Sequence, residues 1–149
     1  MKVWVCVTKP GNWRRVKKGK VFGLSQHAAN LVGLVKRGDI VLVYVLKPTY
    51  SIVGVYQVRS VLEGTKGLWD DRVYPFGIEL ESAEDFKKGI KPISLSSLIG
   101  VSNKNVDVSP FLKGVSIFEV PSTVLEKLKT NRNHSYDSKL NCRYRDLTL

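Results

Sequence analysis

A short segment that joins an apolar strand to a helical pattern carries the residue types best suited to binding an anion. Residues 23–25 (Gly-Leu-Ser) follow an apolar pair at 21–22 and precede the helical pattern. Backbone N–H groups and the positive end of a helix attract polar and anionic ligands at such a corner. Three lysines come just before it: Lys17, Lys18 and Lys20. An anion-binding corner and a plain strand–helix joint with solvated lysines both fit this pattern.

The elements on either side must position this corner. Ser25 is expected to cap a helix that runs to Arg37, because its hydroxyl can accept a backbone N–H from the first turn. Apolar residues recur at helical spacing on one face: Ala28, Leu31, Val32 and Val35. Gly38 is suited to ending the helix. A nearly continuous apolar run at 40–46 then predicts a buried strand.

The charge of the chain is concentrated in its first 60 residues. These hold 11 Lys and Arg and a single acid, Asp39, for a net charge of +10. The remaining 89 residues hold 13 Lys and Arg and 12 Asp and Glu, for a net charge of +1. A concentrated positive charge favours a polyanionic partner, with nucleic acid first. A generally basic protein without such a partner is the alternative.

Two tryptophans lie in polar surroundings. Trp13 is flanked by basic residues and is interpreted either as a lid on the core or as a stacking surface for a ligand ring. Asn12 beside it can offer a donor and an acceptor to the edge of a base. Trp69 lies in a loop at 62–71, which favours a wall that faces a ligand over a core position.

The whole pattern predicts an α+β fold of one domain. Strands are expected at 3–8, 40–46, 51–61, 72–81 and 115–120, and short helices after residue 82, within 92–99 and at 123–129. Gly54 within a strand indicates a bulge or a close backbone approach. Strands adjacent in sequence favour a small, mainly antiparallel, barrel-like sheet with flanking short helices that cover its openings. The domain is expected to span 1–130, with a polar C-terminal tail at 131–149.

Several classes of function find no support in the residues. The chain lacks the phosphate-loop, dinucleotide, zinc-protease and serine-hydrolase motifs, and no cofactor or metal is expected. His27 and His134 lie far apart, and no acid–base–nucleophile set is evident, which predicts a binder rather than an enzyme. No secretory signal or membrane span is apparent, so a soluble, cytoplasmic protein is expected. Cys6 is interpreted as a core residue; a Cys6–Cys142 disulfide is the less favoured alternative.

The ordered motifs also resemble the EVE domain family, which is PUA-like and related to YTH domains. The resemblance covers residues 2–127 and rests on the strand at 3–8, Asn12-Trp13, the segment 21–25, the Gly-Asp turn before 40–45, the strand at 51–58 and the segment 72–75. It implies a small β-barrel and a site for a flipped, often modified, nucleobase of DNA or RNA. The residues that it assigns to this site are Asn12, Trp13, Phe22, Gly23, Leu24, Ser25, Trp69 and Tyr74.

The leading hypothesis is therefore a non-catalytic base reader. The cations expected to bind phosphates are Arg14, Arg15, Lys17, Lys18, Lys20 and Arg37, and their contacts would offset the cost of flipping a base. Alternatives are a subunit associated with an RNA-modifying enzyme and a module that docks on ribosomes or other ribonucleoproteins. The sequence does not indicate whether the partner is DNA or RNA, which base is bound, or what the oligomeric state is.

Overall fold

A six-stranded sheet forms the centre of the computed structural model, which describes residues 1–70, 72–95, 97 and 117–137. Its strands are β1 (Val3–Thr8), β2 (Val21–Leu24), β3 (Ile40–Val45), β4 (Ser51–Glu63), β5 (Phe76–Ser82) and β6 (Ile117–Val120). The spatial order is β2-β5-β4-β3-β1-β6. Among the described strands, only β1 and β3 pair in parallel, while the other neighbours are antiparallel. The expected mixed α+β fold with a mainly antiparallel sheet is confirmed.

The expected closure into a barrel is not found. Among the described residues the sheet is open, with the four-residue strands β2 and β6 at its two edges. A loop takes the outer side of β2, where the indole N–H of Trp69 donates to the carbonyl of Val21 at 2.9 Å. The Trp69 side chain thus takes one of the backbone acceptors on the outer edge of β2.

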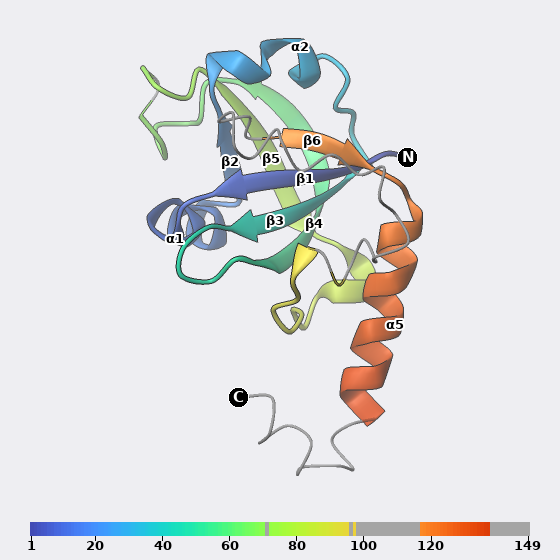
Figure 1. The fold of residues 1–149 in the computed structure, drawn as a ribbon. Coiled ribbons are helices and arrows are strands. Elements are labelled where there is room, and N and C mark those ends of the chain that lie inside the picture. Colours follow the sequence, from blue (N-terminus) through green and yellow to red (C-terminus); the bar gives the residue numbers. More distant parts are fainter. Residues whose placement is uncertain (71, 96, 98–116, 138–149) are drawn as a thin grey trace.

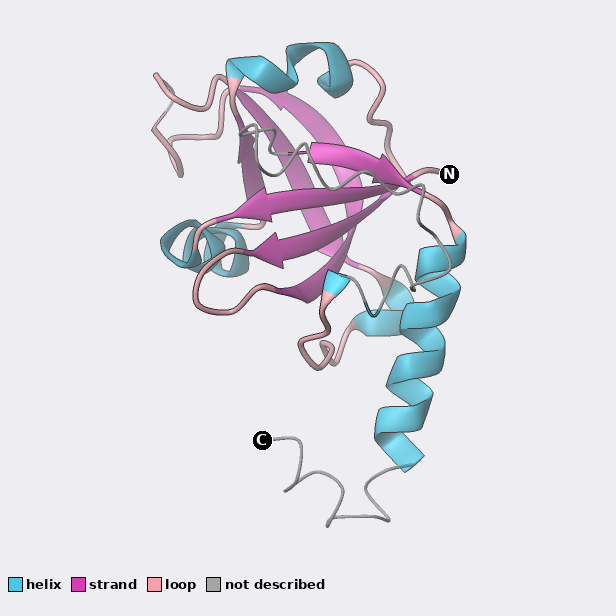
Figure 2. Cartoon of the chain, viewed as in Figure 1, coloured by secondary structure: helices cyan, strands magenta, loops and turns pink. Residues whose placement is uncertain are grey.

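Helices surround the sheet (Figure 2). They are α1 (Pro10–Gly19), the 3₁₀ turn η1 (Gln26–Ala28), α2 (Ala29–Val32), the 3₁₀ turn η2 (Glu84–Phe86) and α5 (Thr123–Asp137). α1 and α5 lie on opposite sides of the molecule (Figure 1). α5 ends at Asp137, beyond the expected end near Lys129. The loop expected at 100–114 and the last residues of the chain, with Cys142, lie outside the described residues.

Each side of the sheet has its own apolar core, which explains why β1 and β3 lack alternation between apolar and polar residues. Val3 and Val5 of β1 face a core shared with α5, whereas Trp4 and Cys6 face a core shared with α1. β3 divides in the same way between these two cores. Because both faces of these strands are buried, nearly every position must be apolar. The interpretation of residues 3–8 as a strand buried on both faces is confirmed, and the buried strand expected at 40–46 ends at Val45.

α1 begins at residues that usually favour a turn. Pro10 and Gly11 are turn formers, yet Pro10 is the first residue of a ten-residue helix. Proline suits that position, since the first N–H groups of a helix have no internal partner. Lys20, with φ of 55°, ends the helix in the left-handed conformation. Trp13 and Val16, three residues apart, face the core, and the basic residues between and after them face outward.

The helix expected from Ser25 to Arg37 is much shorter than predicted. One 3₁₀ turn and one α-helical turn cover residues 26–32, and turns occupy most of the residues that follow. Ser25 precedes η1, but its hydroxyl makes no capping hydrogen bond. The apolar pattern reflects real burial nonetheless, because Ala28 and Val35 lie in the core and Leu31 and Val32 pack against it. Tertiary packing, rather than helical propensity, sets this segment.

Candidate nucleic-acid interface

Four cations project from α1 into solvent. Arg14, Arg15, Lys17 and Lys18 are all exposed. Among the residues that the structure describes, none of the four forms an ion pair with a carboxylate. Unpaired cations on one helix keep their full charge available to an anion. The first four of the expected phosphate-binding residues are therefore brought together by α1.

The two other expected phosphate-binding residues lie apart from this group. Lys20 is partly buried, with its Nζ 5.1 Å from the centre of the Tyr56 ring. Arg37 is exposed but precedes Ile40, at the amino end of β3. Since β1 and β3 are parallel and in register from Val3 to Thr8, α1 starts at the opposite end of this strand pair. Six residues of strand separate the two places by roughly 20 Å, so Arg37 does not join the α1 cations.

Trp13 is partly buried between α1 and the sheet. Its ring edge lies against Gly54 of β4, where a Cβ would come within 2.8 Å of the indole. The rings of Trp13 and Tyr56 meet edge to face, with centroids 6.2 Å apart. The Nζ atom of Lys17 lies over the Trp13 ring, 5.5 Å from its centroid. The close backbone approach expected at Gly54 is confirmed, as is a bulge, since the β3–β4 register shifts beside it.

A chain of contacts connects Asn12 to the loop before β5. Asn12 Nδ2 donates to the Tyr74 hydroxyl at 3.3 Å. The Tyr74 ring meets the Trp69 ring edge to face at 4.8 Å. We call these five residues the aromatic corner: Asn12, Trp13, Tyr56, Trp69 and Tyr74. Four of them were expected to line the site. The structure joins Asn12, Tyr74 and Trp69 by contacts and pairs Trp13 with Tyr56, and the two groups are linked through α1.

Trp69 differs from the expectation that it faces a ligand. Its side chain is only 4% exposed, and its ring packs on Phe22 with centroids 5.4 Å apart. Gly23 permits this packing, because a Cβ there would lie 2.6 Å from the indole. With both faces covered and its N–H bonded to Val21, the ring offers no open stacking surface. Trp69 is therefore the buried member of the aromatic corner, and its role there is to support the other rings.

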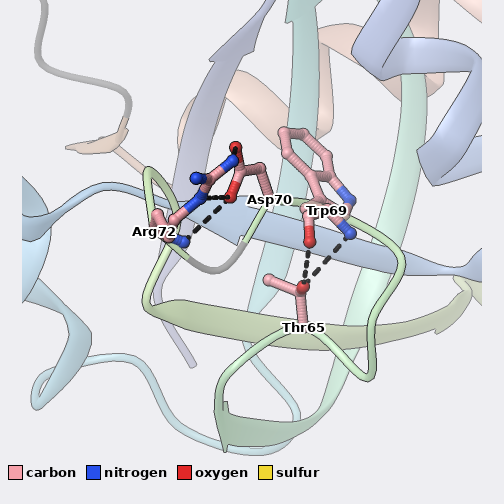
Figure 3. A network of polar contacts seen from close by, with 4 residues as sticks. All are labelled: Thr65, Trp69, Asp70 and Arg72. Carbon is pink, nitrogen blue, oxygen red and sulfur yellow. Dashed lines mark hydrogen bonds and ion pairs between the residues drawn. The ribbon is translucent and has the colours of Figure 1, made fainter.

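Hydrogen bonds within the loop hold Trp69 in place (Figure 3). The Thr65 hydroxyl accepts the backbone N–H of Trp69 at 3.1 Å and donates to its carbonyl at 3.2 Å. Next along the chain, Asp70 pairs with Arg72. The hydrogen bond from the Arg72 side chain is the main reason that the pKa of Asp70 is lowered, and the charge of Arg15 contributes. Asp70 is therefore a carboxylate that tethers the loop beside α1.

The segment 22–25 forms the packed end of β2 rather than an open corner. Phe22, Gly23 and Leu24 are buried. Ser25 is partly buried, and its Oγ is enclosed without a hydrogen-bond partner among the described residues. The following helix is too short to supply the expected positive end, since a macrodipole needs several aligned turns. The positive charge at this side comes instead from α1.

Residues that could hold a metal or act as a nucleophile are scarce. The described residues contain no group of three His, Cys, Asp or Glu that could bind a metal ion. Cys6 is a free thiol in the core, and burial raises its pKa. Within the described part of the chain, no helix is long and apolar enough to cross a membrane.

Tyr56 is a member of the aromatic corner that the sequence interpretation missed. Strand alternation alone would place it on one face together with Gly54, Ile52 and Val58. The bulge between β3 and β4 changes the alternation here, so that Tyr56 and Val58 share the α1 core while Ile52 faces the α5 core. The signal was Gly54, which indicated a close approach but could not identify Trp13 as the partner.

Comparisons with known proteins agree with this architecture. The UPF0310 protein PH1033 of Pyrococcus horikoshii is 26% identical over 122 residues, 70% of this chain and 81% of that protein. The crystal structure of ASCH from Zymomonas mobilis has a TM-score of 0.61 at 15% identity and covers 87% of this chain and 94% of its own.

A complex of the YTH domain-containing protein mmi1 with RNA has a TM-score of 0.58 at 15% identity and covers 94% of this chain and 86% of its own. At such identities the likeness concerns the fold alone. The model of the EVE domain matches residues 2–131, nearly all of the described chain. This protein therefore belongs to the EVE domain family.

Proposed function

We propose that this EVE domain is a non-catalytic RNA-binding module that holds the sugar–phosphate backbone on α1 and receives one unstacked base, plain or modified, at the aromatic corner. One observation carries the proposal: four exposed cations, which have no carboxylate partner among the described residues, project from the helix that also supplies Trp13 and Asn12. Phosphate contacts and a stacking surface on one element are what a single-stranded nucleic acid requires.

The aromatic corner assigns a role to each of its residues. A base stacked on Trp13 would displace the Lys17 ammonium from the ring, and such stacking is worth about 1–3 kcal/mol. Asn12 and the Tyr74 hydroxyl, now hydrogen-bonded to each other, can exchange that bond for one to the edge of the base. Trp69 and the buried residues of β2 keep this arrangement rigid.

The fold supports RNA ahead of DNA. The YTH domain complex that shares the fold contains RNA, and single-stranded RNA presents unstacked bases at low cost. No catalytic role is proposed for any residue of the corner. The action takes place in the cytoplasm, the compartment expected from the sequence.

A pair of matched double variants tests the proposal. Lys17 and Lys18 are consecutive lysines on α1, and Lys87 and Lys88 are consecutive exposed lysines after η2. In fluorescence anisotropy titrations with a nine-nucleotide RNA, K17A/K18A is expected to weaken binding about tenfold at low salt. It should also lower the slope of log Kd against log salt concentration by about 1.4, the value for two contacts to a single strand.

The K87A/K88A variant is the control and should bind like the unchanged protein. If both variants lose the same RNA affinity, binding depends on the net charge of the protein and not on the position of the lysines on α1. Tighter binding of a DNA of the same sequence would reverse the preference for RNA. If the unchanged protein binds neither nucleic acid at low salt, the proposed function is wrong.

A further inference from the structure

A hydroxyl at the carboxyl end of β1 is buried and has no partner. Thr8 is 5% exposed, and within the part of the chain that the structure describes its Oγ1 makes no hydrogen bond. Buried polar groups in proteins are nearly always paired, because an unpaired one loses its bonds to water without replacement. The fold alone therefore does not account for a threonine at this position.

The register of the sheet places Thr8 on the side of the proposed site. Trp4 and Cys6 face the α1 core, and strand alternation gives Thr8 the same orientation. Its neighbour in β3, Val45, is also a member of that core. α1 begins two residues after Thr8 and packs back over this face through Trp13 and Val16. The hydroxyl thus lies on the sheet face that α1 covers.

The position of Trp13 brings the aromatic corner close to Thr8. The indole lies against Gly54, which pairs with Val43, and Val43 pairs with Cys6. Thr8 is the next residue of β1 on the same face after Cys6, about 6.6 Å further along the strand. α1 itself leaves β1 at that point. The strand register therefore places Trp13 and Thr8 on the same face of the sheet, about two residues of strand apart.

Another buried polar group on this face of β1, the indole N–H of Trp4, does have a hydrogen-bond partner. The indole N–H of Trp4, four residues earlier in β1, donates to the Asp39 carboxylate at 3.0 Å. Thr8 has no equivalent partner among the described residues. Valine has nearly the same shape as threonine, and β1 is otherwise rich in valine, so packing does not require the hydroxyl.

We propose that Thr8 is a specificity-determining residue whose hydroxyl bonds the polar edge of the base received beside Trp13; this rests on the proposed function. A hydroxyl both donates and accepts, so it can meet a carbonyl, a ring nitrogen or an exocyclic amine. Each of these groups lies on the edge of a nucleobase. The preferred base is the one whose edge group reaches Oγ1 while its ring stacks on Trp13.

The test compares RNAs that differ at one nucleotide. Five nine-nucleotide RNAs carry uridine throughout except at the centre, where they have adenine, guanine, cytosine, uracil or an abasic sugar. The gain in affinity of each base over the abasic RNA measures base reception separately from phosphate binding. For the preferred base, T8V should reduce this gain about fivefold to tenfold, as expected for one neutral hydrogen bond. T8S, which keeps the hydroxyl, should retain most of the gain.

Thermal unfolding separates a structural role from a binding role. Because Oγ1 has no partner in the described fold, T8V should unfold at the same temperature as the unchanged protein or at a higher one. A T8V protein with a clearly lower Tm, or with the full gain from the preferred base, would overturn the role of Thr8 while leaving RNA binding in place. An unchanged protein that binds none of the five RNAs would overturn the proposed function itself.

Discussion

Trp13 and Trp69 belong to the same cluster but have opposite environments. Residues of β2 together with Tyr74 enclose Trp69: Phe22 and Tyr74 contact its ring, Gly23 admits it, and Val21 accepts its N–H. α1 leaves Trp13 only partly buried and surrounds it with cations. An indole whose N–H and faces are all satisfied belongs to the fold, whereas one with a partly exposed ring can still bind a ligand.

The largest expected effect is the loss of stability when the buried tryptophan, Trp69, is replaced. Trp69→Ala removes a fully packed ring and should lower the free energy of unfolding by about 3–5 kcal/mol, the usual cost of a large cavity. Trp13→Ala should cost less than half as much, because its ring is partly exposed. Urea unfolding followed by circular dichroism measures both. A similar loss for the two variants would show that Trp13 is a lid on the core.

The binding experiment addresses the other half. At a temperature where all variants are folded, Trp13→Ala should weaken RNA binding by about 1–3 kcal/mol, the value of one stacked base. Trp13→Phe should keep most of the affinity, since it retains an aromatic face. If Trp13→Ala binds RNA like the unchanged protein, the base does not stack on Trp13.

Asp39 provides a control that destabilises the protein away from both tryptophans. Its carboxylate accepts the N–H groups of Lys2 and Lys36 and the indole N–H of Trp4, each at 3.0 Å. Asp39→Asn should lower the free energy of unfolding by about 2 kcal/mol at neutral pH, because an amide oxygen replaces a charged acceptor. RNA affinity of the folded protein should stay unchanged, which would separate stability from binding.

The pH dependence of this effect has a defined sign. Burial raises the pKa of Asp39, but the three hydrogen bonds and the charge of the N-terminus outweigh it, so that the pKa lies below 3.8. The charged form thus stabilises the folded chain above the unfolded pKa of about 3.9, and this stabilisation disappears as the pH falls through the folded pKa. The difference between Asp39→Asn and the unchanged protein should shrink between pH 5 and pH 2. If the difference in unfolding free energy stays constant with pH, the effect of Asp39→Asn comes from packing and not from the charge of Asp39.

The smallest expected effects come from replacing the two glycines that contact the tryptophans, Gly23 and Gly54, by alanine. A Cβ at Gly23 would meet the buried Trp69 ring at 2.6 Å, and one at Gly54 would meet Trp13 at 2.8 Å. Gly23→Ala should cost about 1–3 kcal/mol of stability, because the packed ring cannot move away. Gly54→Ala should cost less and should instead weaken RNA binding, since Trp13 can shift outward. The opposite order in thermal unfolding would contradict the comparison.

The sequence predicted those parts of the fold in which burial determines residue type. β1 and β3 face apolar cores on both sides, and their runs of apolar residues admit no other interpretation. α1 was missed because Pro10 and Gly11 are turn formers as well as acceptable residues in a first helical turn. The spacing of Trp13 and Val16, followed by Lys17 and Lys18, was the signal that could have indicated it.

The resemblance pointed to Asn12, Tyr74 and Trp69, which contacts join in the structure, but it did not predict that Trp69 is buried. Only the hydrogen bonds of Trp69 to Val21 and Thr65 determine that this indole is buried. The bond to Val21 joins residues 48 positions apart. Local patterns carry no information about such pairs, and for the same reason the isolated hydroxyl of Thr8 was not recognised.

The bond between Trp69 and Val21 also affects how copies of this protein behave toward one another. β2 lies at an edge of the sheet, and free edge carbonyls are templates on which strands of other molecules can add. The indole occupies one of these carbonyls and its ring covers the adjacent backbone at Gly23. One side chain thereby helps to keep a four-residue edge strand from recruiting a neighbour, and so protects the protein from aggregation.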